Sequence, residues 1–335
     1  MDVEPVPPHL DRQQYGRLAR AERRARSRAR LDWRQRVAVE LADQHGGVAR
    51  RRDLLRAGLT TDDIRAEIER GVWHRGGSHT VVVHGTVPEG EGVLWRALWE
   101  STSSSVLDGA SSLVVAGLEH FTPSAVDVSV PNNVVARDID GVRLHRVRDV
   151  GPAIRTGLRR TRPEVAVLRA AEWAASDRQA ATIIAMTVQQ NLVSPPAVLE
   201  RWRGVVASSR RELLEAVIND VCDGVHSLNE LDFAALCRAR GLPEPTRQAV
   251  RRGPRGRVYL DVLWEDLGLH VEIHGAHHMQ GLTGIDDALR GNDIQLGDPG
   301  LVTLVVPVLG LRLQPDAFLD QVERAIRGAR RRRAG

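Results

Sequence analysis

Two runs near the C-terminal end of the chain alternate apolar and polar residues, and this alternation constrains the fold more than any other feature. The first run covers residues 257–264 (RVYLDVLW) and the second covers residues 268–275 (GLHVEIHG). A period of two is typical of half-buried β-strands, whose successive side chains point to opposite faces. Glu265 and Asp266 lie between the runs and suit a tight turn. The sequence therefore predicts a β-hairpin over this segment.

Each predicted strand carries an acidic residue. Asp261 lies in the first strand, and Glu272 lies in the second strand with His274 two residues beyond it. Residues two apart on a strand share a face, so Glu272 and His274 are expected to point the same way. A register that sets Asp261 opposite Glu272 would bring two carboxylates and an imidazole together. Mg²⁺ prefers oxygen ligands and usually takes one or two carboxylates, so this pattern predicts a divalent-metal site and favours an enzyme over a scaffold.

Composition narrows the class of protein. The chain has 335 residues, of which 42% are hydrophobic and 27% charged, and this suits two or three globular domains. No apolar run is long enough to span a membrane, and the first residues lack a secretory core, so we expect a cytoplasmic protein without membrane contact. Cys222 and Cys237 are too few for a disulfide framework and too far apart for a metal knuckle.

All 47 basic residues are arginine, because the sequence contains no lysine. This excludes a lysine nucleophile, a Schiff base and a phosphate loop of the Walker type. The net charge is only +4, but arginine is concentrated at both ends and around 247–257. Such clusters are typical of surfaces that contact phosphate.

The chain divides into a leader and three further parts. Residues 1–34 are expected to form a basic, partly disordered leader, and the segment 11–37 holds ten arginines against three acids. The segment is interpreted either as a phosphate-binding arm or as a solvated tail. Residues 89–220 are expected to form a mixed α/β and then helical middle region, in which no residues are assigned to chemistry.

Residues 35–88 have the pattern of a small winged helix-turn-helix domain, an architecture common in DNA binding and also in protein–protein contact. Arg50, Arg51 and Arg75 are its candidate nucleic-acid-binding residues. The expected helices are 36–42, 51–56 and 62–70, and the expected wing strands are 71–73 and 80–84.

Residues 221–330 are expected to form an α/β domain around the hairpin. Its predicted elements are a helix over 227–240, the hairpin, a helix over 285–296, a buried strand over 300–306 and a helix over 315–329. This order resembles the restriction-endonuclease-like superfamily of PD-(D/E)XK nucleases, and in particular the branch related to the very-short-patch mismatch-repair endonucleases. The resemblance rests on Ser227-x-x-Glu230, Arg257-x-x-x-Asp261, Val271-Glu272-Ile-His274-Gly275-x-x-His278 and Asp287-x-x-Arg290-x-Asn292.

The resemblance implies a multi-domain α/β protein with a C-terminal restriction-endonuclease-like α/β/α core that cuts DNA with Mg²⁺ or Mn²⁺. Asp261 and Glu272 match the superfamily's metal-binding acids, and Glu230 matches a helix glutamate that supports the metal. His274 takes the position where most members have lysine, and His278 matches a second histidine of the repair endonucleases. Arg257 and Arg290 are the candidate phosphate contacts of this domain.

Other interpretations remain open at this point. The region upstream of the core resembles antitoxin-like winged-helix regions, so the chain is alternatively a non-catalytic DNA-binding regulator built on a decayed nuclease fold. His274, His277 and His278 also suggest zinc, although a strand and the loop after it do not converge without a special turn. DNA is the expected partner in both main interpretations, in repair or in phage defence, and a homodimer or a defence-system protein is the further partner considered.

Overall fold

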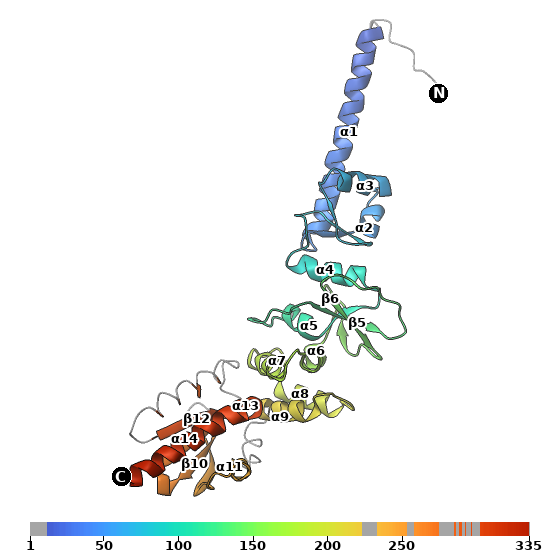
Figure 1. Cartoon of the computed structure of the whole chain (residues 1–335). Helices are drawn as coiled ribbons and strands as arrows, with labels where there is room; N and C mark the ends of the chain where they lie inside the picture. The colour runs from blue at the N-terminus through green and yellow to red at the C-terminus, as the bar shows by residue number, and fades with distance from the viewer. Residues whose placement is uncertain are drawn as a thin grey trace. The chain divides into compact units, whose positions relative to one another are not determined.

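The computed structural model describes residues 12–222, 233–252, 258–274 and 302–334, together with residues 285, 288, 289, 292 and 296. The described residues form a mixed α/β fold with several sheets (Figure 1). The chain splits into two compact units. The N-terminal unit consists of Met1–Ser105 and Val130–Arg146, and the C-terminal unit consists of Val106–Ser129 and Val147–Gly335.

The N-terminal unit begins with one long helix and a three-stranded antiparallel sheet. The sheet has the order β1-β3-β2, so the last strand of the three lies between the other two. Its elements are α1 (Arg12–Asp43), β1 (Val48–Arg50), α2 (Arg51–Arg56), α3 (Thr61–Glu69), β2 (His74–Arg75) and β3 (Thr80–Val82). The helix α4 (Glu91–Glu100) and the strand β6 (Val142–Val147) follow. The predicted boundary after residue 34 falls inside α1, so residues 12–34 of the predicted leader are helical, whereas residues 1–11 lie outside the described residues.

The predicted first wing strand at 71–73 is wrong, because these residues complete the end of α3. The backbone N–H groups of Val72 and Trp73 both donate to the carbonyl of Glu67, at 3.1 and 3.2 Å. Trp73 is fully buried, and its indole N–H donates to Oε1 of Gln35 on α1 at 2.9 Å. The indole therefore joins the core between α1 and the sheet, and β2 starts one residue later.

A capping box starts α3. The Thr60 hydroxyl accepts from the backbone N–H of Asp63 at 3.1 Å, and the Thr60 N–H donates to Oδ2 of Asp63 at 2.9 Å. These two bonds satisfy donors that a helix start otherwise leaves without a partner. Asp63 therefore fixes the first turn of the helix from a buried position.

Two arginines of α1 bind the acidic side chains that α3 buries. Arg34 forms an ion pair with Asp63 and lies 3.6 Å from Glu67, and Arg30 donates to Asp63 at 2.8 Å. Burial raises the pKa of Asp63, but hydrogen bonds from the Thr60 backbone and from Arg30 outweigh it, so the pKa lies below its ordinary value. These contacts, called the α1–α3 clamp below, hold the two helices together through charge.

We expect Asp63→Asn to lower the free energy of unfolding at neutral pH by about 2 kcal/mol, because it removes a charged hydrogen-bond acceptor from the clamp. A carboxylate with a depressed pKa contributes stability above the unfolded-state pKa of about 3.9 and loses it as the pH falls through the folded value. The difference between wild type and variant should therefore shrink below about pH 4. Urea titrations followed by circular dichroism measure it.

Asp62→Asn is the matched control for this experiment, because the Asp62 side chain is 87% exposed and bonds only weakly to Arg65. It should leave stability almost unchanged at any pH. Equal losses for Asp63→Asn at neutral and acidic pH would contradict the clamp.

The C-terminal unit starts with short strands followed by helices. β4 pairs antiparallel with β5 and parallel with β8, and β8 pairs antiparallel with β7. The strands are β4 (Val106–Leu107), β5 (Val126–Pro131), β7 (Ala153–Ile154) and β8 (Arg160–Thr161). The helices are α5 (Gly109–Val115), α6 (Pro163–Glu172), α7 (Asp177–Gln189), α8 (Pro195–Arg203) and α9 (Arg211–Cys222).

The rest of the C-terminal unit contains a four-stranded mixed sheet with the order β12-β11-β10-β9. β10 is antiparallel to both of its neighbours, and β11 is parallel to β12. The strands are β9 (Arg247–Arg252), β10 (Val258–Trp264), β11 (Leu269–His274) and β12 (Val302–Pro307). The helices are α11 (Phe233–Ala239), α13 (Val308–Leu313) and α14 (Pro315–Ala334), and the turn η2 (Glu265–Leu267) joins β10 to β11.

The predicted hairpin is confirmed as β10 and β11, the two middle strands of this sheet. Gly268, expected to begin the second strand, is instead the left-handed residue that ends the turn, with φ of 61°. One face of the hairpin is apolar: Val262, Trp264, Val271 and Ile273 are all buried. Phe318 and Val322 of α14 belong to the same buried core, so this helix covers the apolar face.

Asn292 protects an edge of the sheet. Its side-chain amide donates to the carbonyl of Val305 on β12, and its Oδ1 accepts from the N–H of Val305, both at 2.9 Å. Gln321 of α14 accepts from the same amide at 2.9 Å. The free edge of a strand invites pairing with another chain, and Asn292 occupies that edge at its middle. The role of this motif position in the described structure is therefore structural.

Although α1 has 32 residues, none of the helices in the described part of the chain is both long and apolar enough to cross a membrane.

Candidate functional site

Asp261 of β10 lies directly opposite Glu272 of β11. The antiparallel register pairs Leu260 with Ile273 and Asp261 with Glu272. The arrangement on which the metal hypothesis depends is therefore present in the backbone. Directly opposed residues of an antiparallel pair point to the same face of the sheet.

That face is accessible, in contrast to the apolar face below α14. The side chains of Asp261 and Glu272 are 27% and 32% exposed. Along β11, buried and half-buried residues alternate, and the half-buried ones are His270, Glu272 and His274. The alternation that predicted the strand also places its polar residues on one face of the sheet.

Each carboxylate contacts one imidazole. His270 bonds through Nε2 to Oδ1 of Asp261, and His274 Nε2 lies 3.2 Å from Oε2 of Glu272. The site thus contains two carboxylate–imidazole pairs on neighbouring strands. His270 was not among the predicted site residues, although its position two residues before Glu272 already placed it on the same face.

The other predicted residues of the nuclease site lie outside the described residues. These are Glu230, Arg257, His278 and Arg290, and His277 of the zinc interpretation is outside them as well. Within the described part of the chain, no three His, Cys, Asp or Glu side chains are arranged as a metal-binding group. The chemistry of the donors still fits Mg²⁺ or Mn²⁺, since two carboxylates are the number that such an ion usually takes from a protein.

The predicted nucleic-acid contacts of the N-terminal unit differ in accessibility. Arg75 is exposed, whereas Arg50 and Arg51 are half-buried. Burial lowers the pKa of Arg51, and the charge of Arg75 lowers it further, whereas Glu100 raises it. Of these three arginines, Arg75 is therefore the one that faces solvent.

The loop between β2 and β3 is fixed to α4 through one carboxylate. Glu100 accepts from the backbone N–H groups of Ser78 and His79, both at 2.8 Å, and from the hydroxyl of Thr80 at 2.6 Å. A Cβ added at Gly77 would collide with the Glu100 carboxyl group, so a larger residue there requires that carboxyl group to shift. This loop, the predicted wing tip, is consequently held against α4.

The surface of α3 carries no excess of positive charge. Its exposed side chains are Thr61, Asp62, Arg65 and Glu69. Arg65 lies 3.4 Å from Asp62. In the predicted winged helix-turn-helix, α3 would be the helix that contacts DNA bases, but its exposed residues offer phosphate little attraction.

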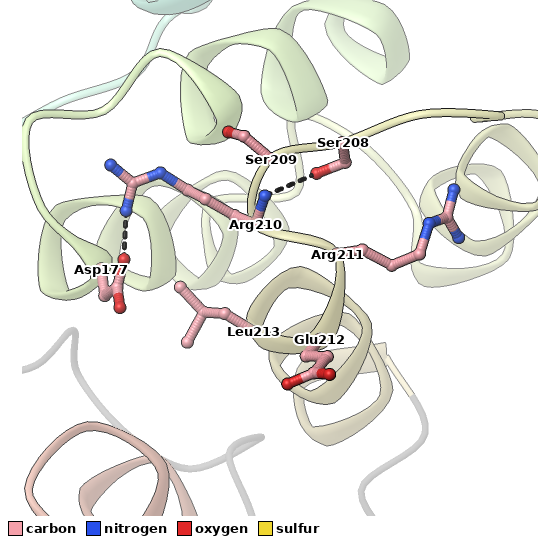
Figure 2. Close-up of a pocket in the computed structure, with 7 residues that line it drawn as sticks. All are labelled: Asp177, Ser208, Ser209, Arg210, Arg211, Glu212 and Leu213. Atoms are coloured by element: carbon pink, nitrogen blue, oxygen red, sulfur yellow. Dashed lines mark hydrogen bonds and ion pairs between the residues drawn. The ribbon is translucent and has the colours of Figure 1, made fainter.

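A pocket at the start of α9 is explained by structural contacts (Figure 2). The Arg210 side chain reaches Asp177 and donates to the carbonyl of Ala174 at 2.8 Å, as the labelled residues of Figure 2 show for Asp177. Glu172 accepts from both serine hydroxyls of the loop, Ser208 and Ser209, at 2.6 Å each. Burial raises the pKa of Glu172, but these serine bonds lower it to below its ordinary value. The polar groups of this pocket therefore hold the loop before α9 in place.

Comparisons with known proteins give little further guidance. No family model matches the chain, and no curated protein matches it. Among solved structures, the chain is similar to the RV2827C protein from Mycobacterium tuberculosis, with 17% sequence identity and a TM-score of 0.38. That similarity covers 57% of this chain and 76% of the other.

Proposed function

We propose that this protein is an endonuclease that hydrolyses phosphodiester bonds in DNA with the help of Mg²⁺ or Mn²⁺. The observation that carries the proposal is the pairing of Asp261 with Glu272 across β10 and β11. The Cβ atoms of such directly opposed residues are only about 4.5–5.5 Å apart. Two carboxylates at that spacing can reach one ion at ordinary metal–oxygen distances.

The order of elements supports a finer assignment of the fold. In the N-terminal unit, a helix, a strand, two helices and two strands follow each other, with the sheet order β1-β3-β2. This is the order expected of a winged helix-turn-helix. In the C-terminal unit, α11 precedes the mixed sheet, and α14 covers its apolar face. This order agrees with a restriction-endonuclease-like core.

In this proposal each polar residue of the face has its own chemical role. A divalent ion held by Asp261 and Glu272 would polarise a phosphoryl oxygen and lower the pKa of water. His274, in contact with Glu272, takes up the proton of the attacking water at a ring nitrogen. His270 orients the Asp261 carboxylate through their hydrogen bond. Glu230 and His278 keep the supporting roles that the resemblance implies.

Plasmid nicking by the purified full-length protein tests the proposal. Supercoiled DNA should be converted to the open circle with Mg²⁺ or Mn²⁺ and should stay intact with a chelator. Duplex, mismatched and single-stranded DNA are to be compared, because the site alone does not select among them. Absence of cleavage on every substrate with both metals would reject the proposal.

A second function is favoured by one feature of the same site, the imidazole that each carboxylate already contacts. Carboxylates occupied in this way suit a non-catalytic DNA-binding regulator of the antitoxin type. Such a protein binds DNA equally well with and without a chelator, and Asp261→Ala leaves that binding unchanged. Binding without cleavage in the same assay would select this function.

A further inference from the structure

We propose that the N-terminal half of α1 is an arm that binds the phosphate backbone of duplex DNA through one row of arginines. The row consists of Arg17, Arg20, Arg24 and Arg28 and is called the arginine stripe below. The choice of DNA as the partner rests on the proposed function, whereas the affinity of the stripe for polyanions does not.

The helical geometry of α1 aligns these four residues. An α-helix turns about 100° and rises about 1.5 Å per residue. Spacings of three, four and four residues therefore keep the stripe within an arc of about 80° and spread it over about 16 Å. Duplex DNA carries one negative charge per ~1.7 Å of its axis, so the stripe is long enough to face several phosphates at once.

Among the residues that the structure describes, no acidic side chain neutralises the charges of the stripe. Its four side chains are exposed, and the described part of the chain supplies them with no acidic partner. The arginines on the other side of the helix are engaged. Arg23 donates to the carbonyl of Ala19 at 3.2 Å, Arg26 lies 3.8 Å from Glu22, and Arg30 belongs to the α1–α3 clamp.

The arm is attached to the N-terminal unit at its C-terminal end and carries charge along its length. Figure 1 shows the N-terminal half of α1 extending beyond α2 and α3, and every residue from 20 to 30 is exposed. Residues 12–30 contain eight arginines and one glutamate. Alanine and arginine favour the helix, but the arginines repel one another. A polyanion that neutralises them would therefore stabilise the arm in its helical form.

Other partners fit this surface less well. A helix that lies on a membrane needs an apolar face with large side chains, and between residues 17 and 30 the arm has only Leu18 and alanines to offer. Within the N-terminal unit, the exposed side chains of α3 carry no net positive charge. The arginine stripe is consequently the strongest candidate in that unit for contact with DNA.

The test measures binding of the full-length protein to a short fluorescent duplex, in a chelator so that cleavage plays no part. The variant Arg20→Gln/Arg24→Gln removes two charges from the stripe. Arg23→Gln/Arg26→Gln removes two charges from the other side of the same helix and is the matched control. The logarithm of the binding constant falls as the logarithm of the salt concentration rises. Each lost phosphate contact should reduce the magnitude of this slope by about 0.9.

We expect the stripe variant to make this negative slope shallower by about 1.8. The control should make it shallower by less than half as much. Circular dichroism should show that both variants remain as helical as wild type, so that a change in slope reports the lost charges and not a lost helix. Equal slopes for the two variants would show that the arginine stripe is not the side of the helix that binds DNA. A stripe variant with the slope of wild type would show that the arm does not contact DNA phosphate.

Two further outcomes separate this proposal from others. Binding to phosphatidylserine vesicles as strong as binding to DNA would overturn the choice of partner. Nicking by a stripe variant that binds DNA like wild type would reject the arm and leave the nuclease standing. Stripe-dependent binding without nicking would reject the nuclease and support the arm.

Discussion

Asp261→Asn and Glu272→Gln will each remove plasmid nicking and leave the fold and DNA binding intact. Both changes keep the size of the side chain and delete one negative charge from the pair that faces solvent between β10 and β11. Loss of a residue that only supports a metal ligand costs about 10–100-fold in activity, so loss of a ligand itself should cost more than about 100-fold. The half-buried position of both side chains makes unfolding by these changes unexpected.

Initial rates of nicking in Mg²⁺ and in Mn²⁺ measure this effect, with binding measured in parallel by anisotropy. Glu244→Gln is the matched control, because Glu244 is a carboxylate of the same unit whose side chain is 57% exposed and pairs with Arg238 at 3.0 Å. It should nick like wild type. Full activity in Asp261→Asn would show that the carboxylate pair is not the catalytic centre.

The part of this site that could be predicted from the sequence is the part that depends on local pattern. Strict alternation identified both strands, and the short turn between them left few registers that keep the apolar residues of both strands on one face. The pairing of Asp261 with Glu272 was one of these registers and was assumed as a condition, and the observed register meets that condition. Gly268 was misassigned because a left-handed glycine at the end of a turn interrupts no apolar pattern.

Features that depend on distant residues were not predicted. The strand β9 has the sequence RQAVRR, whose arginines resemble a solvated loop, and its pairing with β10 supplies the strand character. Arg30 and Arg34 were assigned to a leader because their acidic partner on α3, Asp63, lies some thirty residues away in sequence. The contact between His270 and Asp261 likewise needed the register to be known.

Asp108 is the clearest case of a residue whose role only the structure reveals. It has no exposed surface and caps α5. Its Oδ1 accepts from the N–H of Gly109 and the hydroxyl of Thr161, both at 2.7 Å. Its Oδ2 accepts from the hydroxyl of Ser129 and from Arg169, both at 2.5 Å. One carboxylate thus joins β5, β8, α5 and α6.

Asp108→Ala should therefore lower the free energy of unfolding by about 3–5 kcal/mol, the usual result when one partner of a buried ion pair is removed. The Arg169 side chain, only 20% exposed, would lose its counter-charge, and the Ser129 and Thr161 hydroxyls would lose their acceptor. Asp177→Ala is the control, since the Asp177 side chain is 64% exposed and its ion pair with Arg210 should contribute no more than about 1 kcal/mol. Urea titration of both variants by circular dichroism measures the difference. Equal losses for the two variants would mean that Asp108 is not the residue that joins these elements, whereas the expected gap would identify it as the structural centre of the first half of the C-terminal unit.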